Sequence, residues 1–301
     1  MKKITSKIFR KLGNLSFKIS EYLLSEKSIL LEVKTNDNAV TMSSILIEKG
    51  NDRNLYKTRF GTYLWLKSSS CIDESIINTG VWEDYTTDVV NRLVKPNDYV
   101  LDIGANIGYF SVIFSKLVGE NGKVFAFEPT SDYLKTLKLN LAANNISHCE
   151  VLPYGLSNKE QELEIYLNVH SATLHDPLKN EITPKEIIKL DTLDNFITKN
   201  KIDKIDFIKI DVDGHEPLIL EGAWETLEKY KPIILLEISH MHYLKAGYNA
   251  WNFYKMLKDK QYFIYSEKQL QEIKDETSFL IECGNFAYSS NIVISRKQLY
   301  N

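Results

Sequence analysis

The sequence predicts an α/β protein with a doubly wound, mostly parallel seven-stranded sheet, preceded by an N-terminal helix and a small β-rich appendage. Two observations predict this fold. Short, nearly continuous apolar strands alternate with helix-like segments from residue 99 onward, which is typical of a parallel sheet covered on both faces. The chain has 301 residues, 44% of them hydrophobic, enough for one large core. We therefore divide it into a basic amphipathic helical segment (1–35), the β-rich appendage (36–90) and the sheet domain (91–301).

The N-terminal segment combines positive charge with helical spacing of its apolar residues. No acidic residue precedes Glu21, and the basic side chains are Lys2, Lys3, Lys7, Arg10, Lys11 and Lys18. This pattern predicts a basic amphipathic helix. The segment lacks the unbroken apolar run of a signal peptide or a membrane span. We expect it to pack on the protein or to self-associate, with peripheral binding to an anionic membrane surface as the alternative.

The appendage is predicted from strand-like composition. Residues 39–47 are rich in apolar and β-branched side chains, and residues 61–66 alternate bulky side chains after the turn-prone Gly50-Asn51-Asp52.

The sheet domain shows a regular succession of elements after Pro96-Asn97-Asp98. We expect seven strands at residues 99–103, 124–127, 149–152, 207–210, 233–238, 261–265 and 290–294. We expect helices at residues 107–118, 131–143, 216–230 and 251–260. Ligands of such sheets bind beyond the carboxyl ends of the strands, so the residues that directly follow each strand are the candidates for a functional site.

Charge and cysteine content limit the partners and the compartment. The formal net charge is -3, so the chain lacks the overall positive field that nonspecific nucleic-acid binding needs. Cys71, Cys149 and Cys283 are odd in number and far apart, which argues against a disulfide framework or a zinc cluster. We expect a cytoplasmic protein that does not bind nucleic acid.

A glycine-containing segment, residues 102–108, lies at the first strand-to-helix turn of the sheet. Gly104 and Gly108 would let the backbone approach a ligand, while amides at the helix start face an anionic group. The glycine spacing and the acid Asp102 depart from the dinucleotide fingerprint, because a carboxylate disfavours a pyrophosphate. An acid here favours a cationic ligand such as S-adenosylmethionine, which carries a sulfonium and an ammonium. We expect Asp102, Gly104, Ala105, Asn106 and Gly108 to bind this cofactor.

Two further segments complete the expected cofactor site. Glu128 ends the second strand, where an acidic side chain can accept both hydroxyls of an adenosine ribose. Residues 154–157, which include Ser157, follow the third strand. We expect backbone groups there to contact the adenine ring.

Several segments in order resemble the FkbM family of methyltransferases. They are VLDIGANIGYF (100–110), AFEP (126–129), IKIDVDGHEP (208–217), LDTL (190–193) and GVWE (80–83). The similarity covers about residues 78–240. It implies a class I, Rossmann-like methyltransferase fold and usually O-methylation of hydroxyls on sugars, polysaccharide precursors or secondary metabolites. Asp213 stands where the family more often has a glutamate.

The segment 211–216 (DVDGHE) is the second dense group of polar residues. An alcohol oxygen must lose its proton during methyl transfer, and Asp211, Asp213 or His215 could accept it. Gly214 indicates a turn that would leave both carboxylates at the strand end, although Asp211 could equally cap a helix or position the ribose. A divalent metal on the two aspartates is disfavoured because no third oxygen ligand is evident. We predict no metal site.

Four residues are expected to contact the acceptor: Glu83, Glu216, Glu237 and His240. Glu83 ends the GVWE motif, Glu237 closes the fifth strand, and His240 follows that strand. Two other interpretations stay open, since Glu216 could act only as a first-turn acid of its helix and Glu237 could be a buried, hydrogen-bonded carboxylate.

The residue patterns predict an S-adenosylmethionine-dependent methyltransferase with in-line transfer, and the resemblance to the FkbM family implies that the acceptor is a hydroxyl of a saccharide, a polysaccharide precursor or a secondary metabolite. One alternative is a non-catalytic protein that keeps the cofactor pocket and docks a partner through its N-terminal helix. The other is an NAD-dependent enzyme of the same sheet topology, which Asp102 and the glycine spacing disfavour.

Overall fold

The structure is a computed structural model that describes residues 33–34, 40–41, 43–68, 70–167, 172–173, 184–245, 247–283 and 289–300. The chain divides into two compact units, residues 1–42 and residues 43–301. In the first unit, β1 (Val33–Lys34) pairs with β2 (Val40–Thr41) in antiparallel orientation. Of the segment 1–35, which we predicted to be helical, the structure describes only residues 33–34, and these form β1. The rest of the predicted helical segment lies outside the described residues.

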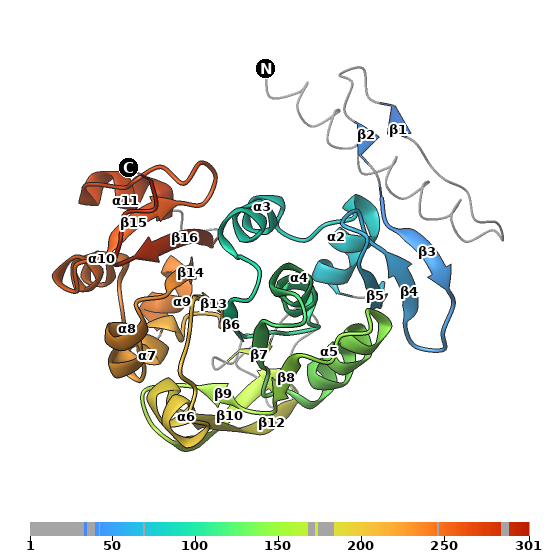
Figure 1. Cartoon of the computed structure of the whole chain (residues 1–301), viewed down its shortest axis with the longest axis horizontal. Coiled ribbons are helices and arrows are strands. Elements are labelled where there is room, and N and C mark those ends of the chain that lie inside the picture. The colour runs from blue at the N-terminus through green and yellow to red at the C-terminus, as the bar shows by residue number, and fades with distance from the viewer. Residues whose placement is uncertain are drawn as a thin grey trace. The chain divides into compact units, whose positions relative to one another are not determined.

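The second unit is built on the predicted seven-stranded sheet, whose order is β15-β16-β14-β13-β6-β7-β8 (Figure 1). The strands are β6 (Tyr99–Ile103), β7 (Lys123–Phe127), β8 (Cys149–Leu152), β13 (Phe207–Ile210), β14 (Ile233–Ile238), β15 (Phe263–Ser266) and β16 (Ser290–Ser295). Only β16 runs antiparallel to its neighbours, β14 and β15. The prediction of a mostly parallel sheet is therefore confirmed.

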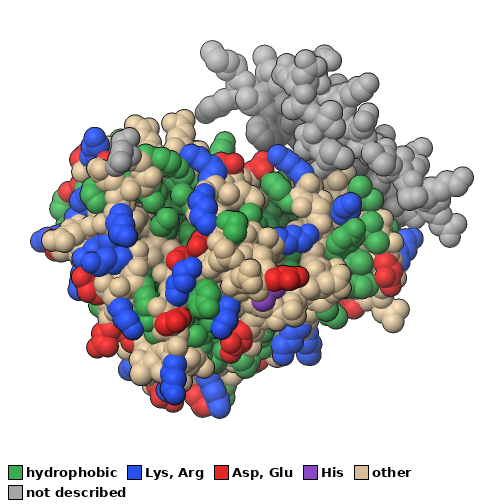
Figure 2. Space-filling model, in the orientation of Figure 1, with side chains coloured by type: hydrophobic (Ala, Val, Ile, Leu, Met, Phe, Trp, Pro, Cys, Tyr) green, Lys and Arg blue, Asp and Glu red, His purple; other side chains and the backbone are tan. Residues whose placement is uncertain are grey.

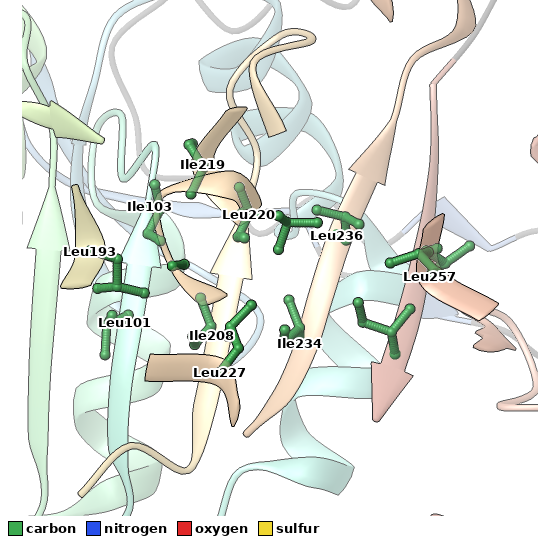
Figure 3. Packing of buried hydrophobic residues seen from close by; sticks show 14 of the residues in the cluster. Leu101, Ile103, Leu193, Ile208, Ile219, Leu220, Leu227, Ile234, Leu236 and Leu257 are labelled. Carbon is green, nitrogen blue, oxygen red and sulfur yellow. The ribbon is translucent and has the colours of Figure 1, made fainter. Parts of the chain in front are cut away.

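Both faces of the sheet are buried, because successive side chains of each strand enter different hydrophobic clusters. Along β6, Val100 joins one cluster, and Leu101 and Ile103 join the other. Figure 3 shows Leu101 and Ile103 in the second cluster beside Ile208 of β13 and Ile234 of β14. Burial on both faces explains why these strands are nearly continuous apolar runs.

Helices cover each face of the sheet (Figure 1). Apolar residues of α2 (Cys71–Thr79), α3 (Asp84–Leu93), α4 (Tyr109–Val118) and α5 (Ser131–Ala143) belong to the cluster that contains Val100. The opposite cluster takes residues from α6 (Leu193–Lys199), α7 (Glu216–Glu221), α8 (Trp224–Tyr230), α9 (His240–Lys245), α10 (Ala250–Asp259) and α11 (Glu276–Cys283). This is the doubly wound arrangement that the sequence predicts.

The single helix predicted over residues 216–230 is wrong, because the structure has two helices there, α7 and α8. Gly222 ends α7, and a Cβ atom on it would lie 2.1 Å from the Ser157 carbonyl oxygen. The backbone approach of another segment thus requires glycine at the break. Asp194 Oδ1 then accepts a 2.8 Å hydrogen bond from the Thr226 amide in the first turn of α8.

Residues 43–93 form an antiparallel sheet of β3 (Ile45–Glu48), β4 (Asn54–Lys57) and β5 (Tyr63–Leu66), followed by α2 and α3. The strand-like composition of this region did not indicate the two helices. The β5 amides of Tyr63 and Trp65 donate to Asn144 Oδ1 and Asn140 Oδ1 at 2.9 and 2.6 Å. The predicted boundary at residue 90 falls inside α3, and both sides of it belong to one compact unit.

A second small sheet lies between β8 and β13 in the sequence, where we predicted no element. It has the order β11-β10-β12-β9, with β9 (Gly155–Leu156), β10 (Gln161–Leu167), β11 (Ala172–Thr173) and β12 (Lys185–Asp191). Its buried side chains Ile165, Ile188 and Leu190 form a cluster of their own.

The described surface shows no single charged face in the view of Figure 2, where Lys and Arg side chains are interspersed with Asp and Glu. None of the helices among the described residues combines the length and the apolar character that crossing a membrane requires.

Candidate functional site

A cavity of about 370 Å³ lies at the carboxyl ends of the central strands. The chain continues from β6 to β7 on one side, whereas β13 and β14 lie on the other side of β6. The cavity is therefore at the topological switch point, where sheets of this type bind ligands. Ten predicted site residues line it: Glu83, Asp102, Gly104, Ala105, Asn106, Glu128, Asp211, Asp213, His215 and Glu237.

The turn after β6 is held by its own backbone hydrogen bonds. The amides of Gly104 and Ala105 both donate to the Phe127 carbonyl oxygen, at 3.1 and 3.0 Å. The amide of Asn106 donates to Glu128 Oε2 at 2.8 Å, and the next two amides also donate within the turn. These five amides therefore donate to Phe127, to Glu128 and within the turn, and the expectation of amides that face an anionic group stays a prediction for the start of α4 at Tyr109.

Gly104 is required by close packing of two strand ends. Its φ is +84°, a left-handed conformation that favours glycine. A Cβ atom there would lie 2.0 Å from the carbonyl oxygen of Asp211. Gly104 thus brings the turn after β6 against the segment after β13, and both walls of the cavity meet there.

Asp102 is a buried carboxylate with one free acceptor. Ser111 of α4 donates its hydroxyl to Asp102 Oδ2 at 2.6 Å, whereas Oδ1 has no hydrogen-bond partner among the described residues. Burial raises the pKa of this carboxyl, and the nearby Lys209 ammonium and Ser111 hydroxyl oppose that shift. A buried carboxylate oxygen without a donor is costly, so it fits a site that receives a donor from a ligand.

Glu128 joins the turns after β6 and β7. Its Oε1 accepts the amide and the hydroxyl of Thr130 at 2.8 and 2.6 Å, and its Oε2 accepts the Asn106 amide. Burial raises the pKa of this carboxyl, while these hydrogen bonds oppose the shift. An ionised carboxylate has about four acceptor positions, so a ligand hydroxyl can still bind.

One end of the cavity is apolar. Phe127 ends strand β7 of the central sheet, and Leu156 comes from β9. The small sheet adds Ile165, Ile188 and Leu190. These side chains offer an apolar surface of the kind that a planar heterocycle occupies.

The opposite end of the cavity is acidic. Asp211 and Asp213 follow β13, Glu237 is the next-to-last residue of β14, and Glu83 precedes α3. The strand does not persist to residue 213, because Asp213 has a φ of +53° and Gly214 a φ of +99°. This turn keeps both aspartates at the cavity, as the sequence predicts.

Lys209 is a functional residue that the sequence analysis missed. It lies on β13 opposite Asp102 of β6, and its Nζ is 2.7 Å from Asp211 Oδ2 and 4.7 Å from the centre of the Phe110 ring. The Lys209 side chain is only 4% exposed. The sequence held a signal for this residue, because Lys209 interrupts the apolar strand 207–210. A lysine that is buried in a strand needs a carboxylate as a partner.

Asp213 has the properties of a proton acceptor at neutral pH. Burial, assisted by the neighbouring Asp211 carboxylate, raises the pKa of Asp213 from 3.8 to about 7. Its Oδ1 lies 3.7 Å from His242 Nδ1. The ideal pKa of a general base is near the working pH.

Four predicted site residues lie outside the cavity lining. Ser157 is buried, with its Oγ 3.0 Å from His215 Nε2. Glu216 Oε1 accepts the amides of Val212 and Gly214 at 3.0 and 3.2 Å. His240 begins α9. In these positions Ser157 and Glu216 support the turn that carries the lining residues.

Gly108, the fourth of these residues, packs two helices together. It begins α4 with a φ of +84°, and a Cβ atom on it would lie 2.3 Å from Leu137 Cδ1 of α5. The absence of a side chain is therefore needed for packing against α5.

Comparison with known proteins adds a family to this geometry. Residues 102–285 match the family described as Methyltransferase FkbM domain, and residues 26–155 match Protein-L-isoaspartate(D-aspartate) O-methyltransferase (PCMT). The chain is 27% identical to methyltransferase sdnD of Sordaria araneosa, over 52% of this chain and 73% of that protein. It is 28% identical to the hexuronic acid methyltransferase AglP of Haloferax volcanii, over 49% of this chain and 60% of that protein.

Solved structures with a similar arrangement are also methyltransferases. Methyltransferase FkbM from Methylobacillus flagellatus is 16% identical, with a TM-score of 0.42 and coverage of 71% of this chain and 56% of that one. The O-methyltransferase from Bacillus cereus, in complex with SAH, is 12% identical, with a TM-score of 0.42 and coverage of 71% and 81%. The fold assignment does not depend on these two structures; it rests on the strand order of the central sheet and on the family match. The FkbM match spans more than half of the sequence and sets aside the NAD-dependent alternative. This chain belongs to the FkbM-domain family and is an S-adenosylmethionine-dependent methyltransferase.

Proposed function

We propose that this enzyme methylates a hydroxyl oxygen of a saccharide or a similar hydroxylated metabolite. The observation that carries the proposal is the division of the cavity into two halves. Strands β6 and β7 and the small sheet provide buried acceptors and an apolar wall, and β13, β14 and α3 provide an acidic wall. The first half suits the cofactor and the second suits the acceptor.

The residues of the first half fit S-adenosylmethionine. The cavity volume of about 370 Å³ is within the usual range of about 300–1,000 Å³ for small-molecule sites. The unpartnered Asp102 Oδ1 would accept from the ammonium group, and Glu128 would accept the ribose hydroxyls. Leu156, Ile188 and Leu190 would contact the adenine ring. When bound, the cofactor supplies a methyl group attached to a positively charged sulfur.

In the second half, we assign the role of general base to Asp213. Asp211 Oδ2 is paired with the Lys209 ammonium at 2.7 Å, so this carboxylate already has a partner inside the protein. Asp213 has a pKa of about 7 and would take the proton from the acceptor hydroxyl as its oxygen bonds to the methyl carbon. Bound S-adenosylmethionine would supply that methyl carbon, and its sulfur would keep the electron pair of the sulfur–carbon bond.

The choice of a saccharide rests on chemistry and on one relative. The carboxyl groups in the second half of the cavity can accept hydrogen bonds from hydroxyl groups, and a sugar has several hydroxyl groups that donate. The Haloferax volcanii protein, 28% identical in the aligned region, is a hexuronic acid methyltransferase.

Transfer of a labelled methyl group tests the proposal. The enzyme is incubated with S-[methyl-³H]adenosylmethionine and an extract of the cells that make it, and the labelled product is hydrolysed to its components. We expect the label as a methyl ether on a sugar or another alcohol, and we expect Asp213→Asn to lower kcat about 100-fold. Label on nitrogen or carbon, or an Asp213→Asn variant with full activity, would contradict the proposal.

A further inference from the structure

We infer that the acceptor carries no anionic group next to the hydroxyl that is methylated. The cavity would take neutral or amine-bearing sugars and reject uronic acids and sugar phosphates at that position, which would distinguish this chain from the hexuronic acid methyltransferase of Haloferax volcanii. This inference rests on the proposed function and narrows its substrate class.

The first argument is the position of the carboxyl groups. Lys209 pairs in register with Asp102 of β6 and Leu235 of β14. Side chains two residues apart on a strand share a face, so Glu237 extends from the same face of the sheet as Lys209. Glu83 approaches from α3, where its Oε2 is 3.5 Å from Asn291 Nδ2. Carboxyl groups from three separate elements thus meet at the acceptor half.

The second argument is the balance of charge. The acceptor half has four carboxyl groups, Glu83, Asp211, Asp213 and Glu237, and Lys209 is the only lysine or arginine among the described lining residues. Its ammonium is engaged by Asp211 at 2.7 Å. The positive sulfur of the cofactor offsets one further carboxylate. No described lysine or arginine of the lining is left for an anionic acceptor, and like charges in contact repel each other.

The third argument concerns hydrogen-bond donors and is independent of net charge. Glu237 Oε2 is buried at the atomic level and has no hydrogen-bond partner among the described residues. It lines the cavity, and a bound acceptor that donates a hydrogen bond would satisfy it. Hydroxyl and ammonium groups donate, whereas a carboxylate only accepts.

The carboxyl groups also affect one another. Burial, followed by the Asp211 carboxylate, raises the pKa of Glu83 from 4.5 to about 7. Burial together with Asp211, Glu216 and Asp213 raises the pKa of Glu237 well above its ordinary value. An ammonium group entering the cavity would relieve this repulsion, and a second anion would increase it.

The experiment separates labelled products by charge. Enzyme and S-[methyl-³H]adenosylmethionine are incubated with a saccharide extract of the source cells whose uronic acid, neutral sugar and amino sugar contents have been measured. Mild acid then releases monosaccharides from glycosyl phosphates, and anion exchange separates the uronic acids and sugar phosphates. We expect at least tenfold less label per mole of anionic sugar than per mole of the other sugars.

Variants test the residues themselves. Glu237→Gln replaces an ionisable carboxyl with a neutral amide that donates hydrogen bonds, so we expect the share of the label found on anionic sugars to rise about fivefold. Glu83→Gln should shift the share of the label on anionic sugars in the same direction. It provides the test if Glu237→Gln does not fold. Glu225→Gln, an exposed position on α8, is the control and should leave the share unchanged. Because the share is a ratio within one preparation, loss of active enzyme does not alter it.

The outcomes separate this inference from the proposed function. Label on anionic sugars at an equal or higher level would overturn the inference and leave the proposed function intact. Exclusion of anionic sugars that neither glutamate variant relaxes would overturn the role given to these carboxyl groups. Label on no sugar or other alcohol would overturn the proposed function itself.

Discussion

Lys209 Nζ lies 2.7 Å from Asp211 Oδ2, and this ion pair joins a buried position of β13 to the cavity that follows the strand. Lys209 is 4% exposed and Asp211 30% exposed as side chains. Removing one partner of a buried pair leaves an uncompensated charge, which costs about 3–5 kcal/mol. The pair therefore maintains the arrangement of carboxylates around it.

Lys209→Met should lower the free energy of unfolding by about 3 kcal/mol, because Asp211 is then left among other carboxyl groups. Urea unfolding measures this change. The double variant Lys209→Met/Asp211→Asn removes both charges and should recover much of the loss. If the double variant were as unstable as the sum of both single variants, the two residues would not act as a pair.

Asp102→Asn should weaken the binding of S-adenosylmethionine at least tenfold, about 1.4 kcal/mol. Asparagine can still accept from Ser111, but it lacks the charge that favours a cationic ligand. The increase in melting temperature on adding the cofactor gives the readout, with NAD as a ligand expected to produce no shift. Asp88→Asn, an exposed position on α3, is the matched control. An unchanged cofactor shift in Asp102→Asn would remove Asp102 from the binding site.

The rate of methyl transfer should rise with pH through about 7 and then level off. Asp213 has a pKa of about 7 and accepts a proton only when it is ionised, so the active form predominates above that pH. A pH profile of kcat/KM under saturating cofactor measures this rise. The rise near pH 7 should be absent from the residual activity of Asp213→Asn. If it persisted in the variant, another group would be responsible.

Glu216→Gln should make stability less dependent on pH. Burial raises the pKa of Glu216 from 4.5 in the ordinary case to about 8 in the folded protein. Between these values the folded state holds a proton that the unfolded state has lost, so folding stability falls as pH rises through this window. Glutamine can accept the same two amides without titrating.

Melting temperatures from pH 5 to pH 8.5 test this expectation. The wild type should lose more stability than Glu216→Gln across that range, and the exposed control Glu225→Gln should follow the wild type. Parallel curves for wild type and Glu216→Gln would show that Glu216 stays ionised in the folded protein.

Gly108→Ala should destabilise the protein more than Gly61→Ala. Both glycines have positive φ, +84° and +70°, so each alanine pays the left-handed strain of about 1–2 kcal/mol. Only at Gly108 does the added carbon meet a neighbour, Leu137 Cδ1 at 2.3 Å, while nothing lies within 4 Å at Gly61. The clash should add about 1–3 kcal/mol, measured by urea unfolding. Equal losses at both positions would mean that α5 moves aside without cost.

The central sheet was predictable because its strands are buried on both faces. Residues 99–103, 149–152, 207–210 and 233–238 begin and end as predicted, since apolar runs between turn residues depend little on distant contacts. The break between α7 and α8 was not predictable. It depends on the approach of Ser157 to Gly222, two residues far apart in the sequence.

The sequence by itself determined the order of the seven strands of the central sheet and the residues that follow each of them, because both are local patterns of apolar and turn-forming side chains. Asp102, Glu128 and Asp211 were found in this way, and all three line the cavity. Only the tertiary structure decided which of the acids have partners. Lys209 lies opposite Asp102 through the pairing of β13 with β6, it contacts Asp211 directly after β13, and Gly108 packs against α5. Charge balance and close packing depend on neighbours in space, and the order of residues in the chain does not specify those neighbours.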